Sequence, residues 1–95
     1  MVGRRIGGRV KFSVHVEVRG LPGIADPEGR TIERALPALG FNGVEGVSVG
    51  KVIAFDLDAT DEASANGEVE QMCARLLSNP VIQRAEISVR PLDSL

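Results

Sequence analysis

Residues able to perform acid–base or nucleophilic chemistry are few and lie far apart in the chain. The 95 residues include one histidine and one cysteine. His15 would need an orienting partner and a pocket to act as a general base, and the sequence shows neither. Cys73 lies within an apolar stripe, where a thiol behaves as a small hydrophobe. One histidine and one cysteine also supply too few ligands for a zinc site.

Four carboxylates close together in the sequence are the remaining metal-ligand candidates. They are Asp56, Asp58, Asp61 and Glu62. They lack the glycine and the regular spacing of a calcium-binding loop. A strand end followed by a helix cap explains the same acids, because carboxylates stabilise the positive N-terminal end of a helix. We therefore predict that the chain binds no metal.

Nucleotide-binding motifs are missing from the sequence, which contains neither G-x-x-x-x-G-K-[ST] nor G-x-G-x-x-G. Gly50 and Lys51 place one cation beside flexible backbone, which alone cannot hold a nucleotide. RNA-recognition domains stack bases on strand aromatics, whereas Phe12 and Phe55 fall on the apolar sides of their strands. We therefore predict no catalytic residues and no bound cofactor in this chain, which would act through partner proteins.

The composition is that of one small globular domain, with 43% hydrophobic and 25% charged residues. A domain of this length builds only a modest core, so we expect a homodimer or a higher homo-oligomer. No segment approaches the ~20 apolar residues of a membrane helix, and a single cysteine cannot form an internal disulfide. We therefore expect a cytoplasmic location and no membrane partner.

The N-terminus is basic. Residues 1–11 hold four of the eleven basic residues and none of the thirteen acids. A basic arm can bind nucleic acid, but glycines interrupt these charges. We therefore predict a flexible extension over residues 1–9, no nucleic-acid partner, a single domain over 10–90 and a short tail over 91–95.

Residues 10–90 show the periodicities of an α+β domain. Apolar residues alternate over 10–19 and 81–89, which predicts half-buried strands. The region 44–58 predicts one long strand if Gly50 is a bend, or a hairpin if Gly50 is a turn. The resulting order, β-α-β(β)-α-β, predicts a ferredoxin-like antiparallel sheet with two helices on one face.

Both helices have recognisable ends. Asp26 can cap the first helix, and Pro37, well inside its pattern, predicts a kink or an early end. The second helix begins near Asp61 and stops at Asn79-Pro80. Its apolar stripe consists of Val69, Met72, Cys73, Leu76 and Leu77.

Several motifs occur together in a recognisable order. They are Asp26-Pro27-Glu28-Gly29, the segment ALPALGF at 35–41, Gly50-Lys51 and the segment CARLLSNPVI at 73–82. Over about residues 10–90, the chain thereby resembles the PurS family, the small subunit of phosphoribosylformylglycinamidine synthase. It departs from the family pattern at Ser48, Ala54 and Pro37.

The resemblance implies a function in purine biosynthesis. The enzyme of this family makes formylglycinamidine ribonucleotide from ATP and glutamine. In its multi-subunit form, a glutaminase subunit releases ammonia, and a large synthetase subunit that uses ATP and Mg consumes it. PurS-like chains bridge the two and form dimers or higher assemblies. The resemblance therefore implies a non-catalytic assembly subunit with these two partners.

Six motif positions are candidates for the partner interface: Asp26, Gly29, Gly50, Lys51, Asn79 and Pro80. Caps, turns and helix stops offer a structural explanation for most of them. Lys51 is the position least explained by backbone geometry, which makes it the best interface candidate.

A regulatory module that resembles the ACT domains is the alternative. It would bind a small metabolite at a dimer interface near a glycine-containing loop, and residues 20–25 form such a loop in this sequence. A metabolite-binding module would melt at a higher temperature with its ligand. An assembly subunit would instead co-elute with the glutaminase and synthetase subunits.

Overall fold

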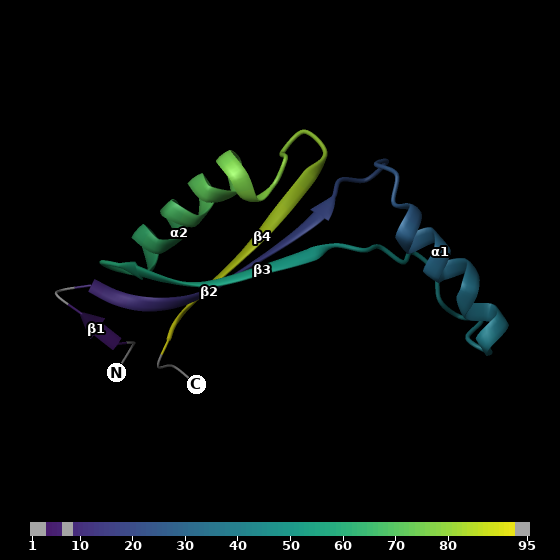
Figure 1. Ribbon diagram of the computed structural model, residues 1–95, viewed down its shortest axis with the longest axis horizontal. Helices are drawn as coiled ribbons and strands as arrows, with labels where there is room; N and C mark the ends of the chain where they lie inside the picture. Colours follow the sequence, from purple (N-terminus) through teal and green to yellow (C-terminus); the bar gives the residue numbers. More distant parts are fainter. Residues whose placement is uncertain (1–3, 7–8, 93–95) are drawn as a thin grey trace.

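The computed structural model describes residues 4–6 and 9–92. Its fold class is α+β, as predicted, with an antiparallel sheet and two α-helices (Figure 1). The elements are β1 (Arg4–Ile6), β2 (Arg9–Gly20), α1 (Pro27–Ala35), the 3₁₀ turn η1 (Leu36–Leu39), β3 (Lys51–Ala59), α2 (Glu62–Met72), the π-helical turn η2 (Cys73–Leu77) and β4 (Gln83–Pro91).

Strand β2 lies at the centre of the sheet and pairs antiparallel with β3 on one side and β4 on the other. The register places Val14 opposite both Phe55 and Val89. Because side chains alternate between the two faces of a sheet, this register gathers the apolar residues of all three strands on one face. Val14, Val16 and Val18 are buried there, which confirms the alternation predicted over 10–19.

Helix α2 covers this apolar face of the sheet (Figure 1). Val69 and Cys73 are buried in the resulting core, as predicted. Burial raises the pKa of the Cys73 thiol, and the nearby charge of Glu70 raises it further. Leu76, predicted on the same stripe, is instead 83% exposed. It lies in η2, where Ser78 N–H donates to the Cys73 carbonyl five residues back, so the α-helical spacing no longer applies.

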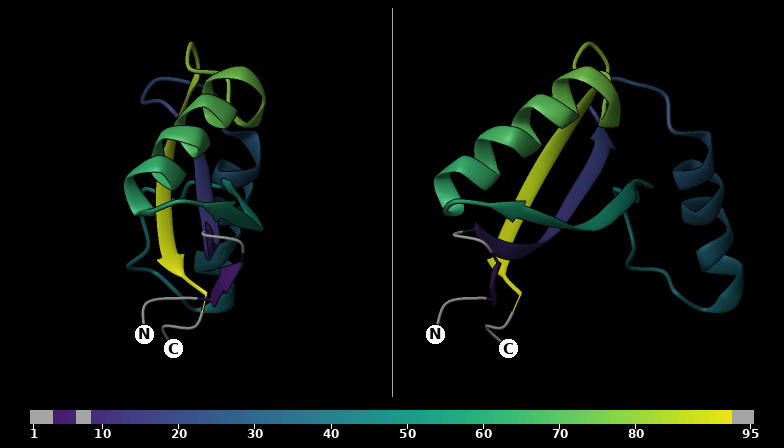
Figure 2. Two further views of the ribbon diagram at one scale, coloured as in Figure 1. Left: turned by 90° about the vertical axis from the view of Figure 1, so that its left-hand side faces the viewer. Right: turned by 60° about the vertical axis from the view of Figure 1, so that its left-hand side comes forward.

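Helix α1 lies beyond the end of the sheet, although both helices were predicted to cover one face (Figure 2). The radius of gyration is 17.5 Å, against about 12 Å for a compact domain of this length. The chain alone is therefore expanded. Helix α1 ends at Ala35 and tightens into η1, which confirms the early end predicted from Pro37.

Gly50 is neither the turn of a hairpin nor a bend within one long strand. Strand β3 begins after it, and residues 44–50 are irregular. The sheet therefore has three long strands and lacks the additional hairpin of a four-stranded ferredoxin-like sheet. A Cβ atom on Gly50 would lie 2.6 Å from the Val18 carbonyl oxygen. This close approach to β2 explains the glycine.

Part of the basic extension, predicted over residues 1–9, has a regular backbone conformation. Arg4–Ile6 form β1, which pairs with the start of β2, and Arg9 already belongs to β2. Backbone pairing with a long central strand was not visible in the composition of the arm. The rest of the extension, and residues 93–95 of the predicted tail, lie outside the described residues.

Candidate partner-docking site

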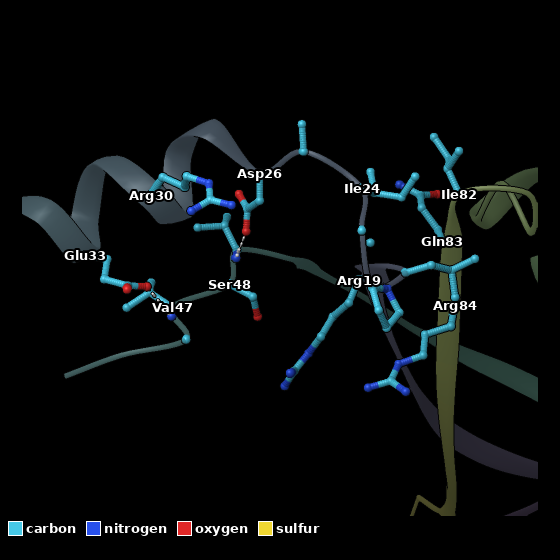
Figure 3. Close-up of a pocket in the computed structure, with 17 residues that line it drawn as sticks. Arg19, Ile24, Asp26, Arg30, Glu33, Val47, Ser48, Ile82, Gln83 and Arg84 are labelled. Atoms are coloured by element: carbon cyan, nitrogen blue, oxygen red, sulfur yellow. Dashed lines mark hydrogen bonds between the residues drawn. The ribbon is translucent and has the colours of Figure 1, made fainter.

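A hollow of about 750 Å³ separates α1 from the end of the sheet (Figure 3). Its walls are the loop 20–26, residues 46–49 before β3, the start of β4 and two side chains of α1. Asp26 lines the hollow, and Gly29 and Gly50 are sequence neighbours of the lining residues Arg30 and Val49. The structure thus brings three of the six predicted motif residues to one region.

Asp26 connects α1 to the segment before β3. One carboxylate oxygen accepts a hydrogen bond from Gly29 N–H at 3.0 Å and caps the helix, as predicted. The other accepts from Val49 N–H at 2.8 Å. These two hydrogen bonds, that from Val49 first, lower the pKa of Asp26 below its ordinary value. The Glu33 carboxylate accepts from Val47 N–H at 2.9 Å, so two carboxylates together hold α1 against residues 47–49.

Gly29 is required by the closeness of this contact. It is buried, and a Cβ atom there would lie 2.6 Å from Asp26 Oδ2, the oxygen that accepts from Val49, and 2.7 Å from the Val47 carbonyl oxygen. Both distances are shorter than real Cβ contacts. The Asp26 to Gly29 motif therefore forms a tight junction between α1 and the segment before β3.

The other three motif residues lie elsewhere. Lys51 is exposed at the start of β3, and it forms no ion pair within the part of the chain that the structure describes. Asn79 accepts a hydrogen bond from Val81 N–H at 3.1 Å in the turn that precedes β4, and Pro80 is exposed in the same turn. Ile82 in turn accepts from Leu21 N–H at 2.8 Å, so this turn supports the loop 20–25.

The sheet face opposite α2 carries charged residues whose cross-strand pairing was not predicted. Glu17 lies opposite Glu86, and Arg19 opposite Arg84. Like charges directly opposite each other destabilise a sheet. The Glu17 carboxylate accepts from Arg19 Nε at 2.8 Å along the same strand, which offsets part of the repulsion. Alternation shows which residues share a face, but only the register shows which of them are opposite.

The residues with chemical potential remain apart. His15 is exposed on β2, with Ala54 and Ser88 opposite it. Asp61 caps α2 by accepting from Ser64 N–H at 2.8 Å, as predicted, and Asp58 pairs with Lys11 at 3.3 Å. In residues 4–6 and 9–92, no three potential ligands of a metal ion come together.

An antiparallel sheet with one helix packed on it and a second held beyond its end defines a class of small α+β domains. Residues 13–91 match the PurS family model, described as phosphoribosylformylglycinamidine (FGAM) synthase. The chain therefore belongs to the PurS family, as its motifs indicated. It is a subunit of phosphoribosylformylglycinamidine synthase, EC 6.3.5.3. No helix of the described chain has the length and apolar character needed to cross a membrane.

Known relatives support this assignment. The PurS subunit from Methanocaldococcus jannaschii is 46% identical over 71 residues, which cover 75% of this chain and 86% of that protein. Its crystal structure matches with a TM-score of 0.77 and 41% identity, over 86% and 99% of the two chains. It is described as a subunit of formylglycinamide ribonucleotide amidotransferase in the purine biosynthetic pathway.

A further match is to a chain of a larger assembly. The structure described as PurLQS from Thermotoga maritima contains a chain that matches with a TM-score of 0.76 and 30% identity, over 83% of this chain and 96% of that one. The crystal structure of the purS subunit from the same organism matches with a TM-score of 0.79 and 30% identity, over 85% and 93% of the two chains.

Proposed function

We propose that this chain is a non-catalytic assembly subunit of phosphoribosylformylglycinamidine synthase. In this proposal it joins a glutaminase subunit to a large synthetase subunit, so that ammonia passes between them. The observation that carries the proposal is the position of α1, which lies away from its own sheet (Figure 2), while large apolar side chains of the single chain stay exposed. The similarity to a chain of the PurLQS assembly supports the same role.

The chemistry explains why such a subunit would be needed. Free ammonia diffuses away or becomes protonated, so the site that releases it and the site that consumes it must be docked and shielded from water. In this proposal ATP and Mg bind to the synthetase partner, this chain binds no cofactor, and the assembly is cytoplasmic. In this proposal the chain positions the two partner subunits relative to each other and takes no part in the chemistry.

The proposed subunit is a homodimer or a higher homo-oligomer. Several large apolar side chains are exposed in the single chain, including Leu39, Phe41 and Leu76. An isolated helix as short as α1 is marginal in water. Because α1 lies off the sheet, packing against a second chain would stabilise it further.

Reconstitution of the synthase tests the proposal. Glutamine-dependent synthesis is measured with the glutaminase and synthetase subunits, with and without this chain, in the presence of ATP and substrate. We expect the rate to depend on this chain. The control supplies ammonium salt in place of glutamine, which bypasses ammonia transfer. An equal glutamine-dependent rate with and without the chain would contradict the proposal.

An ACT-like regulatory function is the second candidate. The observation that favours it is the hollow beside the loop 20–26, because Arg19 and Arg84 line it and could bind a carboxylate. Thermal melting with single amino acids tests this function. We expect no shift for an assembly subunit, whereas a concentration-dependent rise in Tm would favour a metabolite site.

A further inference from the structure

We infer that Asn42 is a site of spontaneous covalent modification, where the side-chain amide becomes a carboxylate through a cyclic imide formed with Gly43. Of the three asparagines in the chain, two precede glycine, in Asn42-Gly43 and Asn66-Gly67, and one precedes proline, in Asn79-Pro80. The structure places them in an irregular segment, a helix and a turn. Only the first of these settings permits the reaction, and this reactivity is independent of the proposed assembly function.

The reaction needs only the main chain and water. The backbone nitrogen of Gly43 attacks the side-chain carbonyl carbon of Asn42, and the new C–N bond closes a cyclic imide. The bond to the side-chain nitrogen breaks, and this nitrogen leaves as ammonia with the proton of the Gly43 N–H. Water then opens the imide at one carbonyl or the other, which gives aspartate or isoaspartate. One water is consumed, one ammonia is released, and no group is oxidised or reduced.

Glycine after the asparagine favours ring closure. It has no Cβ that could obstruct the attacking nitrogen, and its backbone is permissive. Gly43 is exposed, and a Cβ atom built on it would have no atom of the described chain within 4 Å, its sequence neighbours aside. The rotation that brings its nitrogen to the Asn42 side chain therefore meets no neighbouring group.

Hydrogen bonds hold the chain on both sides of residues 42–46 but not within them. Phe41 N–H donates to the Leu36 carbonyl at 3.1 Å, and Val47 N–H donates to the Glu33 carboxylate at 2.9 Å. Between these two anchors, residues 42–46 form no hydrogen bond with any residue that the structure describes. The segment is exposed and lies at the end of the molecule remote from α2 (Figure 1). Ring closure there breaks no hydrogen bond among these residues.

The second Asn-Gly pair provides an internal comparison, because Asn66 and Gly67 lie inside α2. Asn66 Nδ2 donates to the Glu62 carbonyl at 3.1 Å, and the N–H of an interior helical residue such as Gly67 donates to the carbonyl four residues back. Helical φ and ψ do not bring the following nitrogen to the side-chain carbonyl carbon. Ring closure at Asn66 therefore requires local opening of α2, which only a small fraction of molecules undergoes at one time.

Asn79 lacks the nucleophile. Proline has no backbone N–H, so the nitrogen of Pro80 has no proton to lose when a neutral imide forms. The Asn79 side chain also accepts a hydrogen bond from Val81 N–H at 3.1 Å. The sequence thus excludes Asn79, whereas only the structure separates Asn42 from Asn66.

Conversion of Asn42 changes the surface at this end of the molecule. It adds one negative charge to a chain whose formal net charge is −2. The new carboxylate lies in sequence between Phe41 and Val44, which are 58% and 44% exposed. The isoaspartyl product also lengthens the main chain by one carbon. The modified segment is therefore more acidic, and its backbone follows a different path.

Ageing of the full chain followed by peptide mapping tests the inference. Trypsin cleaves after Lys and Arg, so the three asparagines fall in separate peptides, 35–51, 52–75 and 76–84. The folded protein is incubated at constant pH, and chromatography with mass spectrometry measures aspartate and isoaspartate in each peptide against an unincubated sample. We expect Asn42 to convert at least about tenfold faster than Asn66, which reacts only from opened helix, and Asn79 to stay unchanged. Equal rates at Asn42 and Asn66, or no conversion at Asn42, would overturn the inference.

Two further readouts separate the imide and the fold from other causes. Isoaspartate among the products identifies the imide, because direct hydrolysis of the amide yields aspartate alone; a product without isoaspartate overturns this route. In urea both Asn-Gly pairs lose their structure, so we expect Asn66 to convert about as fast as Asn42. If Asn66 stays slow in urea, α2 is not what protects it, and the structural explanation is wrong.

A matched pair of variants tests the contribution of the glycine. Gly43→Ala adds a Cβ beside the attacking nitrogen, and it fits without strain because the site is open and φ of Gly43 is not positive. We expect conversion at Asn42 to slow several-fold. Gly67→Ala also meets nothing within 4 Å, and as the control it should leave the rate at Asn42 unchanged. A Gly43→Ala chain that converts as fast as the wild type would overturn the attack by the Gly43 nitrogen.

Discussion

Asp26 shows how much one side chain determines in this protein. Its cap on Gly29 was predictable, because an aspartate before proline is a local signal for a helix start. Its second hydrogen bond, from Val49 N–H, was not predictable, because that amide lies 23 positions away and its segment has no regular secondary structure. The sequence thus revealed the cap but not the junction that places α1.

Acidification should release this junction. The folded-state pKa of Asp26 is lowered, so its stabilising effect is present above the ordinary value of about 4 and is lost as the pH falls through the folded value. We expect the protection of the Val49 amide from hydrogen exchange to fall in that range. Asp26→Asn should weaken this protection at neutral pH and remove its dependence on pH in that range. Asp61→Asn, which alters only the α2 cap, is the control, and a Val49 amide indifferent to both pH and Asp26→Asn would contradict the assignment.

Two helical glycines should respond to alanine in opposite directions. Gly29→Ala places a Cβ within 2.7 Å of the Val47 carbonyl oxygen, and we expect it to cost about 1–3 kcal/mol. Gly67→Ala meets nothing within 4 Å in the middle of α2, and we expect a gain of about 0.5–1 kcal/mol from helix propensity. Urea denaturation measures both. Equal stability of the two variants would contradict the tight junction at Gly29.

At the scale of helices and strands, periodicity predicted the types and the approximate bounds of the elements. It failed where the backbone departs from a regular period. Leu76 lies in a π-helical turn, and Gly50 precedes a strand instead of interrupting one. The register could not be predicted either, because the periodicity of one strand does not show which residues of β3 and β4 pair with it.

The register places Glu17 opposite Glu86, and this repulsion should make the sheet less stable than one with opposite charges at these two positions. Glu86→Lys would place a cation opposite Glu17 in place of a second anion. We expect it to raise the free energy of unfolding by about 0.2–1 kcal/mol, and less at high salt because both residues are on the surface. Glu86→Gln serves as the control, since it removes repulsion without adding attraction and should fall between wild type and Glu86→Lys. A lower stability for Glu86→Lys would show that the pair does not repel.

At the scale of the whole molecule, the shape was the least predictable feature. Ile32, Leu36 and Leu39 recur at helical spacing, which predicts that one face of this segment is buried, but periodicity does not show what that face packs against. A flat chain of 56 × 31 × 14 Å with a protruding helix is therefore compatible with the same pattern as a compact one. The family assignment, in contrast, was available from the order of short motifs.

Substitution of Lys51 tests whether the surface around it contacts the glutaminase or the synthetase subunit. It is exposed and forms no ion pair among residues 4–6 and 9–92, so Lys51→Glu should leave the fold and the melting curve unchanged. If Lys51 contacts the glutaminase or the synthetase, reversing its charge at the rim of that interface should cost about 1 kcal/mol or more. The amount of this chain needed for half-maximal glutamine-dependent synthesis would then rise about five- to tenfold. Ammonium-dependent synthesis should be unaffected. Arg90→Glu reverses an exposed cation elsewhere on the sheet and is the matched control; equal titration curves for the two variants would remove Lys51 from the interface.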